Sequence, residues 1–168
     1  MRRITAASIA AYAITALVLP CAAAHAGDTP KLKEGLWDIR GERIENPGGK
    51  RTEFAYKLCR DHAYDKAAEA LLKNVKGCTT VIKKLDSGKF SYASTCTVDG
   101  MTIVSNGLSL YKSDSSTHSE THAAYTPAFN GKSEETMTQD QQYLGKCPTG
   151  MKPGDRIAPD GIIRHHDQ

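Results

Sequence analysis

Apolar and polar residues alternate along much of the chain beyond residue 30, and this two-residue period is typical of half-buried β-strands. Within residues 31–44, Trp37 and Ile39 fall on one face and charged residues fall on the other. A second alternating run follows the turn-like residues 46–49 and ends at Cys59. Further strand-like runs, separated by turn compositions, cover residues 78–85, 90–98, 103–111, 116–125 and 134–144. The pattern therefore predicts about seven strands.

The period changes to three and four residues between Asp61 and Val75, which predicts one amphipathic helix. Asp61 is suited to an N-cap, and Gly77 to the left-handed residue that ends a helix. We expect the apolar stripe of this helix to pack on the sheet. The stripe consists of Tyr64, Ala67, Ala68, Leu71, Leu72 and Val75.

The order of these elements predicts a mainly β protein, a curved antiparallel meander or partly open barrel of about seven strands with one inserted α-helix. Residues 27–150 form this single domain, with the helix near 61–75, and residues 151–168 form a C-terminal tail. The last two strand-like runs lack an apolar face, which a closed barrel around a lipid needs from every strand. We therefore expect either a polar cavity or an open sheet, with Asn106-Gly107 as a bulge or break.

Residues 1–26 have the features of a cleavable signal peptide, so we expect a periplasmic or secreted chain that begins at Gly27. These features are Arg2 and Arg3, the apolar run Ile9–Leu19 and the small-x-small site Ala24-His25-Ala26. The apolar run is shorter than the roughly 20 residues of a membrane span, so no transmembrane segment is expected in the mature chain. The alternative is a lipoprotein that begins at Cys21.

Removal of the leader reduces five cysteines to four, namely Cys59, Cys78, Cys96 and Cys147. An even number in an oxidising compartment predicts two disulfides, and the wide spacings do not fit a zinc site. A hairpin that turns near residues 87–88 would place Cys78 opposite Cys96. This favours Cys78–Cys96 with Cys59–Cys147, and a Cys59–Cys78 bridge across the helix remains the alternative.

Charge and motifs exclude several classes of function. The chain has 22 basic and 19 acidic residues, and loss of Arg2 and Arg3 leaves 20 against 19, without the basic stripe of a nucleic-acid-binding protein. No serine-hydrolase elbow, zinc-protease motif or phosphate-binding glycine loop occurs. His118 and His122 share a strand face but would lie about 13 Å apart, too far to share one ion. We expect no catalytic activity, no cofactor and no metal site.

Five aromatic residues are the candidate ligand contacts, because the alternating pattern places them on one concave face. They are Trp37, Phe54, Tyr56, Phe90 and Tyr92. The sequence thus favours a non-catalytic binding or accessory protein for a small apolar or amphipathic ligand. The alternative is an interaction or inhibitor module that docks on another envelope protein through a strand edge or its polar last strands. An uncharacterised enzyme is a third interpretation.

Several short motifs in a fixed order make the mature chain resemble the DUF3617 family of uncharacterised exported bacterial proteins. They are Lys33-Glu34-Gly35-Leu36-Trp37, Cys59 before the helix, Cys78 and Cys96, Gly145-Lys146-Cys147-Pro148, Met151-Lys152-Pro153-Gly154-Asp155 and Pro159-Asp160-Gly161. The resemblance implies an exported, disulfide-bonded β protein and implies no activity. The Gly-x-Trp start, at Gly35 and Trp37, also resembles the first strand of lipocalin-like calycin barrels.

Overall fold

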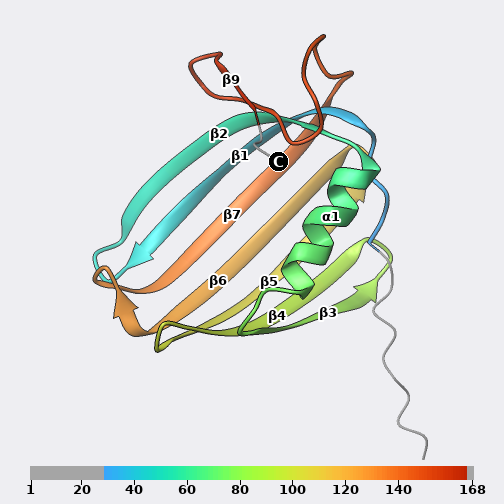
Figure 1. Cartoon of the computed structure of the whole chain (residues 1–168). Helices are drawn as coiled ribbons and strands as arrows, with labels where there is room; N and C mark the ends of the chain where they lie inside the picture. The colour runs from blue at the N-terminus through green and yellow to red at the C-terminus, as the bar shows by residue number, and fades with distance from the viewer. Residues whose placement is uncertain (1–28, 166–168) are drawn as a thin grey trace, which may run out of the picture.

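The computed structural model describes residues 29–165, so the predicted signal peptide and Cys21 lie outside the described residues. These residues form one antiparallel sheet and one helix, α1 (His62–Lys73), as Figure 1 shows. The long strands are β1 (Gly35–Asn46), β2 (Lys50–Arg60), β3 (Cys78–Asp86), β4 (Lys89–Val98), β5 (Met101–Ser113), β6 (Ser116–Phe129) and β7 (Lys132–Gly145). Two short strands follow, β8 (Arg156–Ile157) and β9 (Ile163–Arg164). The predicted fold class is confirmed.

The strand order in the sheet is β3-β4-β5-β6-β7-β1-β2-β8-β9, and every neighbouring pair is antiparallel. The first strand therefore lies between the second and the seventh, while β3 to β7 follow one another as a meander. The sheet is open, with β3 at one edge and β9 at the other. In the part of the chain that is described, the free side of β3 has no neighbouring strand.

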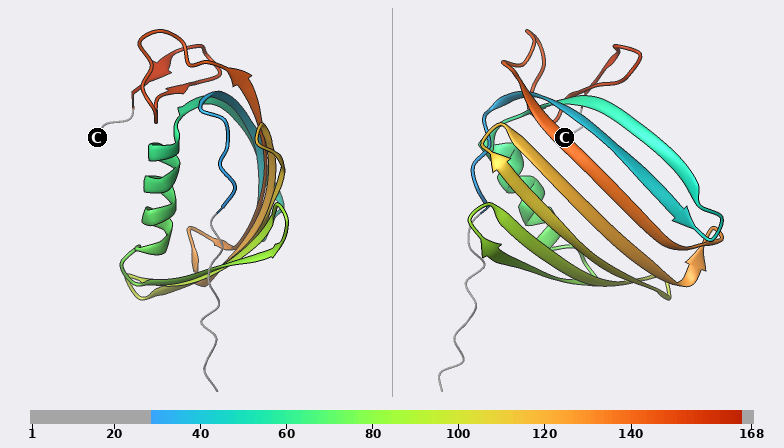
Figure 2. Two further views of the ribbon diagram at one scale, coloured as in Figure 1. Left: turned by 90° about the vertical axis from the view of Figure 1, so that its right-hand side faces the viewer. Right: turned by 180° about the vertical axis from the view of Figure 1, so that it is seen from behind.

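The sheet is strongly curved, and α1 lies on its concave side (Figure 2). Tyr64 of α1 packs against the core cluster that contains Trp37, Ile39 and Leu58. We call the sheet face that carries Trp37 the inner face and the opposite face the outer face. Directly paired residues of neighbouring strands point to the same face, so the registers assign every strand residue to one of the two.

The two glycines at the aromatic end of the sheet allow a close backbone approach. Gly35 has φ +141°, and a Cβ there would lie 3.0 Å from the Tyr143 ring and against the carbonyl oxygen of Gly145. Only glycine adopts this conformation without strain. Trp37 follows two residues later and is completely buried. The Gly-x-Trp start is therefore the point at which β1 and β7 meet most closely.

The predicted bulge or break at Asn106-Gly107 is wrong, because β5 is continuous and pairs in regular register with β4 and β6 through these residues. The ring of Tyr92 lies over Gly107 and occupies the space that a side chain would fill. A cross-strand aromatic ring of this kind compensates for the missing packing of a strand glycine.

The predicted helix is present, with Asp61 as its N-cap. The Asp61 carboxylate accepts a hydrogen bond of 2.7 Å from the backbone N–H of Tyr64. The C-cap is Asn74, whose backbone N–H donates to the carbonyl oxygens of Ala70 and Leu71. Gly77 has φ +79° but lies beyond the cap, in the turn that leads into β3.

The expected packing of the helix stripe on the sheet is wrong. No residue of α1 is buried, and Leu71 and Leu72 are 72% and 62% exposed. Residues 29–34 contact both α1 and the sheet: the Thr29 hydroxyl donates to Glu69 of α1, and the Lys33 N–H donates to the carbonyl oxygen of Asp114 in the β5–β6 turn. Leu32 of this segment is 5% exposed and takes a place in the core cluster. Its carbonyl oxygen lies 2.9 Å from Nε2 of His62.

Both favoured disulfides are present. Cys59 and Cys147 join β2 to the segment after β7, with their Cα atoms 5.6 Å apart. Cys78 and Cys96 lie directly opposite each other in the β3–β4 register. The two bridges thus flank α1, one just before its start and one just after its end.

The predicted C-terminal tail contains β8 and β9, which extend the sheet beyond β2. Backbone hydrogen bonds of 2.9 and 2.8 Å connect Cys59 to Asp155 and Gly154. His165 lies with Nδ1 3.0 Å from a carboxylate oxygen of Asp155. None of the helices within residues 29–165 has the length and apolar character to cross a membrane.

Candidate functional site

The five predicted aromatic contacts all lie on the inner face, but two of them are enclosed by protein. Trp37 is 0% exposed, its Nε1–H donates to the carbonyl oxygen of Lys33 at 2.9 Å, and its ring meets Tyr143 edge-on at 5.8 Å. Phe90 is 3% exposed and meets Tyr111 edge-on at 5.5 Å. Both side chains are therefore core residues.

Phe54, Tyr56 and Tyr92 are half-buried, so they are the members of the set with surface available to a ligand. The Phe54 and Tyr56 rings stack at 6.5 Å, and burial raises the pKa of the Tyr56 hydroxyl. The Tyr92 hydroxyl donates to Oγ1 of Thr121 at 2.9 Å, which holds its ring across the sheet. Ligand contact by these three residues stays a prediction.

Arg60 connects α1 to the aromatic end of the inner face, and the sequence pattern did not single it out. Its guanidinium lies 5.3 Å from the Trp37 ring, 2.7 Å from the Asp65 carboxylate of α1 and 2.9 Å from the side-chain oxygen of Gln141. Charge alternation on β2 gives no signal for this role, because the contacts join three segments that are distant in sequence.

The middle of the inner face is polar and uncharged. By register, Ser109 of β5, Ser119 of β6 and Gln139 of β7 lie side by side, and Ser94 of β4 pairs with Ser105 of β5. All of them are half-buried. Together with Thr121 we call these residues the polar belt.

The far end of the inner face carries paired charges, which we call the charged end. Lys132 forms ion pairs with Glu135 and with Glu45, the latter at 3.6 Å, and its ammonium lies 4.9 Å from the Tyr125 ring. Arg43 lies 3.1 Å from Glu135. The hydrogen bond to Glu135 raises the pKa of the Lys132 ammonium.

The C-terminal half of α1 and the turn after it present an apolar helix patch, defined as Leu71, Leu72 and Val75. These residues are 72%, 62% and 47% exposed. Leu71 and Leu72 follow Ala68 by three and four residues, and Val75 follows Leu71 by four. This spacing continues the side of the helix on which Tyr64 packs against the core. The patch thus continues the inward side of α1 and is not covered by protein within the described residues.

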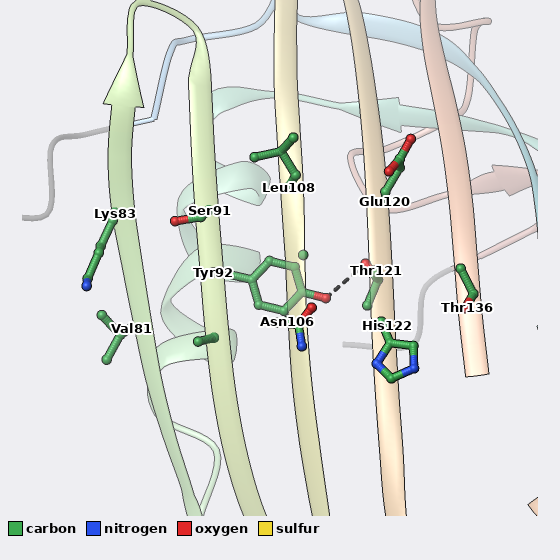
Figure 3. A pocket seen from close by; sticks show the side chains of 12 residues that line it. Val81, Lys83, Ser91, Tyr92, Asn106, Leu108, Glu120, Thr121, His122 and Thr136 are labelled. Carbon is green, nitrogen blue, oxygen red and sulfur yellow. Dashed lines mark hydrogen bonds between the residues drawn. The ribbon is translucent and has the colours of Figure 1, made fainter. Parts of the chain in front are cut away.

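The outer face has a shallow depression of about 610 Å³ over β3 to β7 (Figure 3). Val81 and Leu108 contribute apolar surface to it, and Lys83, Glu120 and His122 contribute polar groups. A second depression, of about 540 Å³, lies around Gly41. Both are wide open to solvent, and their lining includes one predicted aromatic contact each, Tyr92 in the first and Phe54 in the second.

The two histidines on β6 lie on this outer face, and each has its own carboxylate partner. Nδ1 of His118 is 2.9 Å from Asp140, and Nε2 of His122 is 3.7 Å from Glu134. The hydrogen bond that the His118 ring donates to the Asp140 carboxylate raises the pKa of His118. No group of three or more metal-ligating side chains occurs within residues 29–165.

Comparison with known proteins gives one family. Residues 32–147 match the family described as "Protein of unknown function (DUF3617)". The chain belongs to this family. In this DUF3617 protein the matched region begins at Leu32 in the core and ends at Cys147 of the long-range disulfide. It includes the seven long strands and α1, and excludes β8 and β9. No curated protein matches the chain.

Proposed function

We propose that this DUF3617 protein is an exported, non-catalytic binding protein whose inner face holds a small amphipathic ligand. The apolar helix patch carries this proposal. Full burial of one leucine side chain contributes about 1.5–3 kcal/mol, and two adjacent leucines on the inward side of α1 remain largely exposed. A hydrocarbon chain placed against the patch would gain this free energy, and the polar belt opposite would meet a polar group.

Two features support export. Two disulfides are typical of proteins that fold in an oxidising compartment, so the periplasm or the exterior of the cell fits their presence. Residues 1–26 supply the signal peptide in this proposal, with cleavage after Ala26. Lipidation at Cys21 is the alternative mode of export.

The binding role is supported over catalysis by the charges of the inner face. Arg60 is paired with Asp65, and Lys132 is paired with Glu135. In this proposal these pairs stabilise the fold, and the inner face is assigned no role in proton transfer. The resemblance of the Gly-x-Trp start to lipocalin-like barrels is in keeping with this proposal: Trp37 of β1 is buried, and the sheet is open.

The test uses 1-N-phenylnaphthylamine, a neutral hydrophobic probe that fluoresces when it leaves water. We expect it to bind the mature protein, and the double variant Leu71→Ser, Leu72→Ser to bind at least tenfold more weakly. Because both leucines are exposed, the free energy of unfolding should change by less than about 0.5 kcal/mol.

The matched control is Val81→Ser, Val104→Ser, which removes two outer-face side chains that are 46% and 45% exposed. This control should bind the probe like the unmodified protein. Equal binding by the leucine variant, or an equal loss in the control, would refute the inner-face site.

The free edge of β3 favours a second candidate function, docking of an extended segment of another envelope protein. Alternate residues of this nine-residue strand present backbone groups at the free edge, and Lys83 and Lys84 lie near its end. The partner would be acidic. Crosslinking in an envelope extract should give a product that Lys83→Glu, Lys84→Glu abolishes and Lys50→Glu, Lys57→Glu retains. If no reproducible product forms, this candidate fails.

A further inference from the structure

The polar belt consists of groups that both donate and accept hydrogen bonds. Ser109, Ser119 and Gln139 form one row across β5, β6 and β7. Ser94 and Ser105 form a second row across β4 and β5, and the row that contains Thr121 lies between the two. Hydroxyl and amide groups pair well with ligand hydroxyls, which also donate and accept. Because the belt is half-buried, a ligand placed on it would replace hydrogen bonds to water with hydrogen bonds to these groups.

The cations at the two ends of the inner face, Arg60 and Lys132, have anionic partners. At the aromatic end, Arg60 is held by Asp65 and lies over the Trp37 ring. At the charged end, Lys132 is 16% exposed and is held by Glu135, which is 14% exposed. A carboxylate or phosphate on the belt would have to break one of these pairs, and a partly buried charge left without its partner is costly.

A neutral polar group can bind on the belt without leaving a buried charge unpaired. It forms hydrogen bonds with the serines and Gln139 and leaves both ion-pair clusters intact. The belt itself contains no charged side chain, and the nearest charges in its two register rows have opposite signs, Lys84 of β3 and Glu135 of β7. The ring of Tyr92, fixed by its bond to Thr121, adds an apolar surface next to the belt.

We propose that the ligand of the inner face combines one hydrocarbon chain with an uncharged, hydroxyl-bearing head group, the chemistry of a sugar or glycerol head. The chain packs against the apolar helix patch and the head lies on the polar belt. This inference rests on the proposed binding function and specifies the class of its ligand.

The experiment compares three probes with the same twelve-carbon chain, each below its micelle-forming concentration. Dodecyl maltoside is neutral and hydroxylated, sodium dodecanoate is anionic and dodecyltrimethylammonium is cationic. Each is titrated against the 1-N-phenylnaphthylamine complex, and its Kd is obtained from displacement. We expect the maltoside to bind at least tenfold more tightly than either charged probe.

The outcomes separate the two proposals. Equal or tighter binding of a charged probe would overturn the inference on the head group and leave the binding function in place. Failure of all three probes to bind would overturn both the head-group inference and the binding function, because the inner face would then bind no hydrocarbon chain.

A single added charge tests the position of the head group. Ser119→Lys places a cation in the centre of the belt, and we expect it to shift the ratio of maltoside to dodecanoate affinity at least fivefold towards dodecanoate. Ser109→Lys should do the same if Ser119→Lys fails to fold. The control is Ser91→Lys on the outer face of β4, which should leave the ratio unchanged. An unchanged ratio in a folded belt variant would refute the placement.

Discussion

At the residue scale, two strand glycines are paired with aromatic rings across the sheet. Phe54 of β2 lies over Gly41 of β1, and Tyr92 of β4 lies over Gly107 of β5. A glycine inside a strand loses packing, and a ring from the neighbouring strand restores it. These pairs place half-buried aromatic surface on the inner face, which is why two of the predicted ligand contacts remain accessible.

Replacement of Gly107 by alanine should be destabilising. A Cβ at this position would lie 2.6 Å from the carbonyl oxygen of Glu120 and against the Tyr92 ring. Overpacking of this kind costs about 1–3 kcal/mol, which urea unfolding measures. Asn106→Ala, at an exposed outer-face position of the same strand, is the control and should change stability little. Unaltered stability of Gly107→Ala would contradict the close contact.

His118 should titrate above its ordinary pKa, because its hydrogen bond to Asp140 favours the protonated ring. The protonated form is thus favoured more in the folded chain than in the unfolded chain. The resulting stabilisation is complete below the unfolded pKa of about 6.5 and is lost as the pH rises through the folded pKa.

NMR titration of the His118 ring protons measures this pKa directly. Asp140→Asn should lower it, since the main cause of the shift is removed. Glu134→Gln, which acts beside His122, is the control and should leave the His118 value where it is. A His118 pKa that does not respond to Asp140→Asn would refute the assignment.

At the element scale, the side-chain hydrogen bonds and ion pairs that attach α1 to the rest of the protein lie between His62 and Glu69. Asp65 is paired with Arg60, and Glu69 accepts a hydrogen bond of 3.1 Å from Thr29. Beyond Glu69 the apolar helix patch has no cover in the described chain. The N-terminal part of the helix is therefore held by side-chain contacts, and its C-terminal end is largely exposed.

Hydrogen exchange should show this division. We expect the amides of residues 71–74 to exchange at least tenfold faster than those of residues 65–68, because opening of the unsupported half breaks few contacts. Arg60→Ala removes the ion pair with Asp65 and should accelerate the slow group, whereas Lys57→Ala on the outer face of β2 should not. Uniform protection along α1 would contradict the division.

The helix also shows what periodicity can and cannot predict. Its existence, its N-cap at Asp61 and its inward side follow from local spacing, which depends only on backbone geometry. Its contact with the sheet does not, because Leu32, distant in sequence, takes the core position that the stripe was expected to fill. Periodicity identifies the apolar side of the helix. Which residues that side contacts depends on the tertiary structure, here on the position of Leu32 in the core.

At the scale of the whole molecule, the two disulfides close loops of different length. Cys59–Cys147 closes a loop of 88 residues and connects the β1–β2 edge to the end of β7. Cys78–Cys96 closes 18 residues within one hairpin. A longer closed loop restricts the unfolded chain more strongly.

Removal of the longer bridge should therefore cost more. The chain-entropy relation gives about 4.6 kcal/mol for 88 residues against about 3.2 kcal/mol for 18. We expect Cys59→Ser, Cys147→Ser to unfold at a lower urea concentration than Cys78→Ser, Cys96→Ser. The reverse order would show that native contacts outweigh loop length. Mass spectrometry of the non-reduced protein should detect no free thiol in the mature chain.

The sequence by itself determined the β class, the single helix, the four cysteines with their favoured pairing and the shared face of the five aromatics. These features depend on alternation, capping and spacing, which act over a few residues. Only the tertiary structure decided that Trp37 and Phe90 are enclosed while Phe54, Tyr56 and Tyr92 keep exposed surface. The exposure of the apolar helix patch and the grouping of the polar belt were likewise decided only by the tertiary structure. Both depend on which distant segments become neighbours, above all on β1 lying beside β7 and on residues 29–34 contacting α1 and the β5–β6 turn.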